Sequence, residues 1–242
     1  MAPPVDDKTG FEKTIDGALT DSAWDEYDCD LMKIVRQFNQ YLAQTPGFKP
    51  LDWILVKAMI WTETSGPSKK AWKTKPMQIG NPGDPGLLAL FSRSGGGDLI
   101  IPPVFKPELT AASATTKPLM NIKAGIAYLL MRSATFDYKT FLQGAISNYK
   151  VLPGDSFAKI ARRQHSTTET LQRLNPSVNI LHPKEIIKFQ EAVTKMVITN
   201  WNPITTATIA GRYNVGDDDY AKKLEYCLAV MGRIKRTIKC PP

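Results

Sequence analysis

The segment that most constrains the fold is the apolar run "LDWILVKAMIW" at residues 51–61, in which Lys57 is the only charge after Asp52. A helix that is apolar on nearly every face belongs at the centre of a domain. The run therefore predicts a buried helix over about 51–63. It closes on "TETSG", which places Glu63 at the end of this helix.

Glu63 follows Met59 and Leu55 at steps of four, so on a helix it emerges beside apolar neighbours. Two interpretations are open: a solvated residue at the helix end, or an acid held in a dry pocket. Removal from water would raise the pKa of such a carboxyl group and keep it protonated near neutral pH. We favour the second interpretation, because other motifs described below point to the same chemistry.

The length and composition bound the class of protein. A chain of 242 residues can form one large domain or two smaller ones. With 43% hydrophobic and 22% charged residues, the composition is that of a soluble, globular protein, and no apolar run reaches the length of a membrane span. The opening "MAPPVDDKTGFEKT" lacks the basic start and apolar core of a secretory signal. We therefore expect synthesis in the cytoplasm and, for any work outside it, delivery by another route.

Charge is unevenly distributed along the chain. The net charge is +8, but residues 1–30 carry nine acidic and two basic side chains, which leaves +15 on the remainder. A basic body favours an anionic partner such as nucleic acid, a membrane surface or a cell-wall polymer, although a solvated surface explains it as well. The lysines and arginines do not cluster with stacking aromatic residues, so we expect no nucleic-acid partner.

Cysteine and histidine are scarce. Cys29, Cys227 and Cys240 are too few for a disulfide scaffold and too scattered for a zinc site. We favour three unpaired thiols over a single Cys227–Cys240 bridge. The two histidines, His165 and His182, do not favour a metal site or a catalytic triad. We expect no metal and no organic cofactor.

Apolar spacing predicts further helices over roughly 22–45, 121–134 and 137–146. Residues 64–118 are rich in Gly, Pro, Ser and Lys, and such a long irregular stretch within a domain is often functional. After residue 193 the pattern is helical again, with two helices around the turn "YNVG".

The sequence pattern changes at residue 148, where about forty residues predict a strand, two helices and a second strand. Tyr149 and Val151 alternate as in a strand, and "LPGD" makes a turn. Asp155 is placed to cap the first helix, Ser156–Gln164. Thr167 or Thr168 caps the second, which "NP" ends.

This segment, "YKVLPGDSFAKIARRQHSTTETLQRLNP", resembles a LysM module, a βααβ fold that binds glycans containing N-acetylglucosamine. The matching residues are Tyr149, Val151, Pro153, Gly154, Asp155, Ile160, Ala161, Leu171, Leu174 and Asn175. The resemblance implies that two loops, 153–157 and 179–183, hold the glycan. The glycan-binding residues it implies are Gly154, Asp155, Ser156, Asn179, Ile180 and Leu181. Lys184 and Glu185 replace the usual Gly-Gln pair, and a fold retained only as a spacer is the alternative.

The flanking sequence resembles the catalytic domain of soluble lytic transglycosylases, relatives of goose-type lysozyme. The family has Glu-Ser, Gly-Leu-Met-Gln and Ala-Tyr-Asn; this chain has Glu63-Thr64, "KPMQI" at 75–79 and "RYN" at 212–214, in the same order. The resemblance implies a mainly α, lysozyme-like α+β domain over 1–146 and 194–242, with the βααβ LysM domain inserted at 147–193. It implies Glu63 as the catalytic residue and a set of substrate-binding residues: Thr64, Ser65, Met77, Gln78, Ile79, Tyr213 and Asn214.

In this family one glutamate acts as acid and then as base, and the C6 hydroxyl of muramic acid attacks C1, so the product is a 1,6-anhydro sugar. Most glycosidases add a second carboxylate, which acts as the base or the nucleophile. Asp84, Asp98 and the run Asp217–Asp219 lie near groove-forming segments by this resemblance. One of them opposite Glu63 would favour a hydrolytic muramidase, although each reads more simply as a turn or cap residue.

The function favoured by the sequence is cleavage of the MurNAc–GlcNAc backbone of bacterial peptidoglycan, whose strands are the expected partner. We expect a delivered antibacterial effector of a type VI-like secretion system, acting in the periplasm or cell wall, with a cognate immunity protein and the secretion apparatus as further partners. Alternatives are a muramidase or phage endolysin, and a non-catalytic peptidoglycan-binding or tail-hub protein.

Overall fold

The computed structural model describes residues 8–92, 94–238 and 240 of the chain. The first seven residues, part of the stretch in which no secretory signal is expected, lie outside this range. The chain divides into two compact units, one running up to Thr135 and again from Ile198, the other covering Phe136–Val197. The second unit thus interrupts the first in sequence. The predicted boundaries at 147 and 193 fall inside its two strands.

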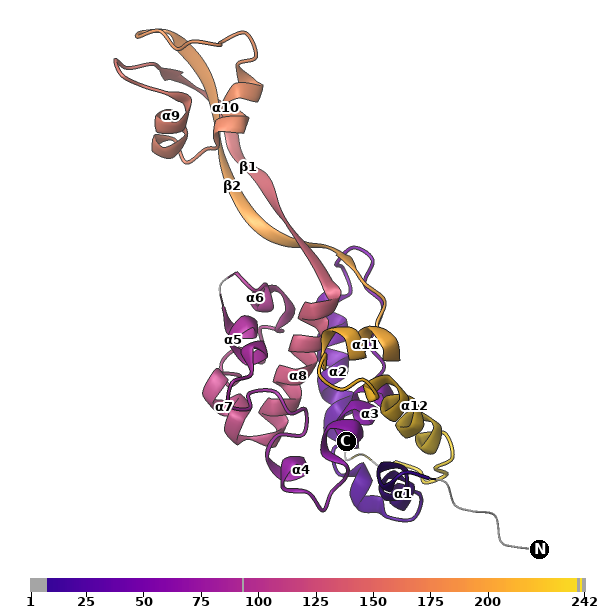
Figure 1. Cartoon of the computed structure of the whole chain (residues 1–242). Coiled ribbons are helices and arrows are strands. Elements are labelled where there is room, and N and C mark those ends of the chain that lie inside the picture. Colours follow the sequence, from indigo (N-terminus) through magenta and orange to yellow (C-terminus); the bar gives the residue numbers. More distant parts are fainter. Residues whose placement is uncertain (1–7, 93, 239, 241–242) are drawn as a thin grey trace, which may run out of the picture. The chain divides into compact units, whose positions relative to one another are not determined.

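The first unit is built from helices (Figure 1). Its α-helices are α1 (Gly10–Asp16), α2 (Asp28–Leu42), α3 (Trp53–Thr64), α4 (Lys70–Thr74), α5 (Pro85–Phe91), α6 (Gly97–Ile100), α7 (Ala111–Thr116), α8 (Pro118–Ser133), α11 (Thr206–Arg212) and α12 (Tyr220–Met231). Two 3₁₀ turns, η1 (Gly17–Leu19) and η2 (Ser22–Asp25), join α1 to α2. The stretch 64–118, expected to be irregular, contains the four short helices α4–α7.

Helix α3 is the central helix of this unit, as its apolar sequence predicts. Asp52 caps it by accepting a hydrogen bond from the Ile54 N–H at 2.9 Å, and Ser65 ends it in the left-handed conformation. It packs against α2 and α12. Its one buried cation, Lys57, is paired with Asp25 and Asp28 at 2.7 Å each, which makes a charge tolerable at this depth.

Helix α8 contacts α4–α7 on one side and α11 on another (Figure 1). Its apolar face, with Ile122, Ile126 and Leu130, is buried as predicted. Gly125 lets the Met77 side chain approach, because a Cβ at this glycine would lie 2.4 Å from the Met77 Cβ. Helix α8 therefore supports the segment around Met77 directly.

The cysteine prediction is wrong. Cys29, at the start of α2, forms a disulfide with Cys240, across a sequence separation of 211 residues. Cys227 is a buried free thiol on α12, where it contacts the Thr62 hydroxyl of α3 at 3.5 Å. It faces the core rather than the C-terminal segment. Neither three unpaired thiols nor a Cys227–Cys240 bridge describes the chain.

The second unit contains most of a two-stranded sheet of β1 (Ala134–Lys150) and β2 (Ile186–Trp201), whose ends at 134–135 and 198–201 belong to the first unit. The strands are antiparallel: Thr140 bonds to Thr194, and Gly144 further along accepts from Gln190. The helix predicted over 137–146 is wrong, because these residues lie in β1. The pattern after residue 193 is strand as far as Trp201, whereas the two helices predicted around "YNVG" are confirmed as α11 and α12. The segment "ATFDYKTF" is rich in aromatic and β-branched residues, and its partner strand lies some fifty residues away, where helical spacing gives no sign of it.

Between these strands lie α9 (Phe157–Arg163) and α10 (Thr168–Leu174). They pack on a small core that consists of Val151, Ile160, Ala161, Leu171 and Ile187. Thr167 caps α10 as predicted. Ser156, not Asp155, caps α9 by accepting a hydrogen bond from the Lys159 N–H. The prediction of Asp155 as the cap is wrong, because its carboxylate is bonded to Tyr149, Leu152 and Arg163 instead.

No helix within the described ranges combines the length and apolarity needed to cross a lipid bilayer.

Candidate functional site

Glu63 lies in a pocket of about 350 Å³ in the first unit. The pocket gathers residues from four separate parts of the sequence. Its lining consists of Glu63, Met77, Gln78, Ile79, Asn81, Asp84, Tyr128, Tyr213 and Asn214. The structure therefore brings together six of the predicted site residues: Glu63, Met77, Gln78, Ile79, Tyr213 and Asn214.

The Glu63 side chain is half-buried at the end of α3, where it lines the pocket. Burial raises its pKa to about 7, against an ordinary value of 4.5. Hydrogen bonds from Tyr220 and Asn214 oppose this rise, and the negative charge of Asp217 adds to it. The Tyr220 hydroxyl, at the start of α12, donates to Glu63 Oε1 at 2.8 Å. At neutral pH the group is divided between acid and carboxylate, so it can both give and take a proton.

Tyr213 closes one side of the pocket. It follows α11, and its hydroxyl donates to the Met77 carbonyl at 2.7 Å. Its ring meets Tyr128 of α8 edge-on, with ring centroids 5.6 Å apart. Desolvation holds the pKa of Tyr213 well above its ordinary value, so the phenol stays protonated as a donor. These contacts fix the segments around Tyr213 and Met77 against each other.

The segment 75–80 is held by side chains from within it and from α8. Asn121 accepts from the Met77 N–H at 2.9 Å and donates to the Ile79 carbonyl at 2.9 Å. Gln78 between them adopts a positive φ of 52°, so the chain turns at that residue. The Gln78 amide donates to the Lys75 carbonyl, and Asn81 donates to Gln78 Oε1. Hydrogen bonds to Lys75 and Asn81 therefore fix the Gln78 side chain at the pocket wall.

The remaining predicted residues take other positions. Thr64 is buried, and its hydroxyl donates to the Ile60 carbonyl at 2.7 Å within α3. Ser65 is the left-handed residue that ends the helix. Neither is among the residues that line the pocket. Met77 is fully buried and Ile79 nearly so, which places their side chains largely beneath the pocket surface.

Asp84 is the second carboxylate among the residues that line this pocket. Both of its oxygens accept backbone hydrogen bonds at 2.7 Å, from Gly80 and from Gly86. It thus caps α5 and ties that helix to the end of segment 75–80. This is the turn and cap role expected of an aspartate in a Gly-rich loop.

The other candidate carboxylates are not in this lining. Asp217 pairs with Lys223 at 2.7 Å and acts on Glu63 only through its charge. Asp219 pairs with Lys222 at the surface. Asp98 is exposed on α6 and lies 3.7 Å from Lys106. Asp218 is exposed as well.

Sequence reasoning missed three residues that shape the site: Tyr220, Tyr128 and Asn121. Tyr220 follows the "RYN" segment by a few residues, and Tyr128 lies in the helix predicted over 121–134. Each is a tyrosine on a helix that packs against the rest of the first unit, and a covered phenol needs a hydrogen-bond partner. That requirement is the only signal that could have found them.

The second unit presents its predicted binding residues on two loops. Gly154 has a positive φ of 78°, which a glycine adopts without strain. Ser156 caps α9 and Asn179 is exposed. Ile180 is 72% exposed, whereas Leu181 packs against the small core.

Asp155, in contrast, has a side chain only 2% exposed. It accepts from the Leu152 N–H and the Tyr149 hydroxyl, both at 2.9 Å, and pairs with Arg163 at 3.0 Å. These donors, led by the Leu152 N–H, lower its pKa. Asp155 therefore stabilises the first loop through these bonds, and its side chain is hardly accessible to a ligand.

Comparison with protein families gives a match over residues 149–188, to the LysM domain. Residues 149–188 form a LysM domain. The match begins at Tyr149 and ends at Lys188, so it encloses both helices and both loops. A LysM domain implies binding to peptidoglycan. The chain matches no curated protein and no solved structure.

Within the LysM domain, Asn175 joins the second helix to the second strand. Its amide donates to the Leu171 and Lys188 carbonyls, and its oxygen accepts from the Lys188 N–H at 2.8 Å. At the other end, Val151 exchanges backbone hydrogen bonds with Glu185 and Lys184 at 2.8 Å. The substitution of Lys184 and Glu185 for Gly-Gln therefore leaves the strand pairing intact, with Lys184 at a positive φ of 74°.

Among the described side chains, no three His, Cys, Asp or Glu residues gather in a way that could hold a metal ion.

Proposed function

We propose that this chain cleaves the glycan backbone of peptidoglycan as a lytic transglycosylase, with Glu63 as its single acid and base. The LysM domain supports the choice of polymer, since it implies peptidoglycan binding. The first unit supports the cleavage. The observation that carries the proposal is the Glu63 carboxyl group, half-buried in a pocket, with a pKa near 7 and flanked by residues from the other two predicted motifs.

The chemistry requires Glu63 to begin as the acid. It donates its proton to the glycosidic oxygen as the bond from C1 to that oxygen breaks. The resulting carboxylate then takes the proton of the C6 hydroxyl of the muramic acid, whose oxygen forms the new bond to C1. The products are a free sugar hydroxyl and a 1,6-anhydro end, and Glu63 is protonated again. A pKa near the working pH serves both steps.

The neighbouring side chains suit this sequence. Tyr220 fixes the orientation of the carboxyl group through its hydrogen bond to Oε1. Asn214 also bonds to Glu63 and reduces the cost of the carboxylate form. Gln78 lines the same pocket, and its amide has a second donor and a second acceptor position beyond its bonds to Lys75 and Asn81, as a sugar acetamido group would need. The protein thus holds the acid in place before substrate arrives.

A hydrolytic muramidase is the second candidate, favoured by one observation: Asp84 lines the same pocket as Glu63. In that mechanism Asp84 would activate a water or stabilise the sugar cation. Its two short backbone hydrogen bonds argue for a structural role instead. We therefore place the transglycosylase first.

The test is digestion of purified sacculi, followed by mass spectrometry of the released muropeptides. The proposal predicts 1,6-anhydro products from the native chain and none from Glu63→Gln. Products that have gained water would support the muramidase. Lack of release by the native chain, with binding to sacculi retained, would leave a non-catalytic wall-binding protein.

We further propose that the chain acts in the periplasm or cell wall as a delivered antibacterial effector, neutralised in the producing cell by an immunity protein that covers the Glu63 pocket. The Cys29–Cys240 disulfide supports an oxidising compartment, because such bonds persist there and are rare in the cytosol. The test is expression in bacteria with and without an added periplasmic signal. Lysis is expected only from the exported form and only with Glu63 intact.

A further inference from the structure

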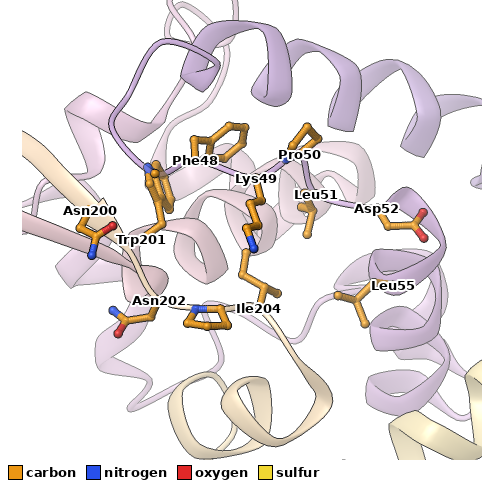
Figure 2. Close-up of a pocket in the computed structure, with 12 residues that line it drawn as sticks. Phe48, Lys49, Pro50, Leu51, Asp52, Leu55, Asn200, Trp201, Asn202 and Ile204 are labelled. Atoms are coloured by element: carbon orange, nitrogen blue, oxygen red, sulfur yellow. The ribbon is translucent and has the colours of Figure 1, made fainter.

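The first unit has a second cavity that the proposed cleavage does not use. It encloses about 570 Å³, within the range of about 300–1,000 Å³ that is usual for ligand pockets. One wall is the loop between α2 and α3, and the other is the end of β2 with the segment that follows it (Figure 2). Both walls belong to the same compact unit. None of its lining residues lines the Glu63 pocket.

The two walls are fixed to each other. The Trp201 indole N–H donates to the Thr45 hydroxyl at 2.9 Å, and its ring meets Phe48 edge-on at 4.9 Å. Gly47 lies so close to Asn200 that a Cβ there would be 2.5 Å from the Asn200 Oδ1. The cavity therefore exists before any ligand arrives, which lowers the entropic cost of binding.

The loop wall is equally well held. Asn39 of α2 accepts from the Leu51 N–H at 2.8 Å and donates to the Leu51 carbonyl at 2.9 Å. On the other wall, the Asn202 N–H and side-chain amide both donate to the Ser133 carbonyl. Loops that a rigid scaffold holds in this way are where binding residues concentrate.

The cavity combines apolar walls with one available cation. Phe48, Pro50, Leu55 and Ile204 supply apolar surface. Lys49 extends from the loop into the space between the walls, toward Ile204 (Figure 2). Within the described residues, the Lys49 ammonium group has neither an ion-pair partner nor a hydrogen-bond partner. A cation beside apolar surface attracts an anion that brings an apolar body with it.

The other polar side chains of the cavity narrow the range of ligands that it could bind. The Asn200 amide can pair with a peptide group, since it offers both a donor and an acceptor, whereas the Asn202 amide is directed to the Ser133 carbonyl. Asp52 is committed to the Ile54 N–H, and its carboxylate points away from Lys49 (Figure 2). A sugar would need more hydroxyl partners than this cavity offers. A short peptide with small apolar side chains and a carboxylate matches the lining.

We propose that this cavity binds the peptide stem of peptidoglycan, with Lys49 pairing with a stem carboxylate and the Asn200 amide with one of its peptide groups. The choice of stem rests on the peptidoglycan binding that the LysM domain implies, and not on cleavage by Glu63. The chain would then hold both components of its polymer, the glycan at the LysM domain and the peptide at the cavity.

The test uses the full chain and isothermal titration calorimetry with a synthetic stem tetrapeptide that contains no sugar. The native chain should bind the peptide with free carboxylates and bind its fully amidated form far more weakly. Lys49→Gln should weaken binding about tenfold or more, as expected for loss of a charge-assisted hydrogen bond. Lys33→Gln, a change at an exposed lysine of α2 outside the cavity, should leave binding unchanged.

Ile204→Trp, which fills the cavity, should abolish binding while the far-ultraviolet circular dichroism stays native. Glu63→Gln should bind like the native chain, so a failure of the cleavage proposal is seen in muropeptide release and not in this titration. The proposal is overturned if the native chain does not bind the peptide, or if Lys49→Gln or the amidated peptide binds equally well. Loss of binding in Glu63→Gln would overturn it too, because the peptide would then sit in the Glu63 pocket.

Discussion

Tyr220 and Glu63 meet across the interface of α12 and α3, where the phenol donates a 2.8 Å hydrogen bond to the carboxyl oxygen Oε1. The two residues are 157 positions apart in sequence. The pair joins the helix that carries the acid to the helix that follows the "RYN" segment. It therefore makes the position of Glu63 depend on the C-terminal part of the first unit.

Tyr220→Phe should move the alkaline limb of the activity profile to higher pH. The phenol stabilises the carboxylate form, so its loss raises the pKa of Glu63 further. The rate at the optimum should fall roughly tenfold, because the acid loses the hydrogen bond that orients it. Turbidity loss of purified sacculi across pH measures both effects. Tyr226→Phe is the control, since this tyrosine of the same helix bonds to Asp16 instead. Identical profiles for the two variants would contradict the assignment.

Glu63→Gln should change how stability depends on pH. The folded pKa, about 7, lies above the ordinary value of 4.5, so the folded state binds the proton more tightly than the unfolded state. The stability due to this group is fully present below about 4.5 and declines as pH rises through 7. The glutamine variant lacks this decline. Its stability relative to the native chain should rise by roughly 3 kcal/mol between acidic and alkaline pH.

Urea denaturation at about pH 4 and about pH 8 would measure that difference. Glu108→Gln, at an exposed position, provides the matched control and should show a much smaller change. A native-minus-variant difference that stays constant with pH would mean that Glu63 is solvated in the folded chain.

Asp84 separates the two cleavage mechanisms. Asp84→Asn keeps an oxygen that can accept from one of Gly80 and Gly86, so the fold should persist. Under the single-glutamate mechanism this variant still releases anhydro muropeptides. Asp84→Ala should lower the free energy of unfolding by about 1–2 kcal/mol through loss of the cap. A folded Asp84→Asn that releases no muropeptide would favour the muramidase.

The parts of the fold that the sequence predicts well are those with a local cause. The run around Met59 is apolar on all faces, and the structure buries it as α3. Helix α8 and the LysM domain likewise carry their pattern within a few tens of residues. The Glu63 pocket could be anticipated only by combining short motifs, none of which specifies the pocket alone.

The parts that the sequence does not predict have distant causes. The local pattern at 137–146 predicts a helix in place of β1, because the pairing partner of this strand, β2, lies beyond the two LysM helices. The Cys29–Cys240 bond joins the two ends of the first unit, and no spacing rule covers 211 residues. Asp155 stands where a helix cap belongs, yet Tyr149, Leu152 and Arg163 offer it three donors, so Ser156 takes the cap. In each case a tertiary contact overrides a local preference.

Reduction of the Cys29–Cys240 bond should destabilise the first unit. For loops of 100 residues or more the chain-entropy model assigns a disulfide about 5 kcal/mol. The same C-terminal segment carries Arg236, which pairs with Asp25 and donates to the Ala18 and Leu19 carbonyls. Denaturation with and without a reductant measures the effect. The double variant Cys29→Ser/Cys240→Ser should start at the reduced stability and not respond to reductant. An unchanged midpoint for the reduced native chain would contradict the prediction.

Substitutions at two residues of the LysM domain should have different effects, one on peptidoglycan binding and the other on folding. Ile180 is 72% exposed on the second loop, so Ile180→Ser should leave the domain folded while weakening retention on insoluble peptidoglycan several-fold, through loss of buried apolar contact. Ile186→Ser, at an isoleucine 57% exposed on β2, is the matched control and should bind as the native chain does.

Asp155→Ala should instead destabilise the LysM domain, because Tyr149, the Leu152 N–H and Arg163 lose their common acceptor. Co-sedimentation in a Glu63→Gln background, with hydrogen exchange to follow folding, distinguishes the two. Equal retention of all three variants would show that neither loop takes part in binding.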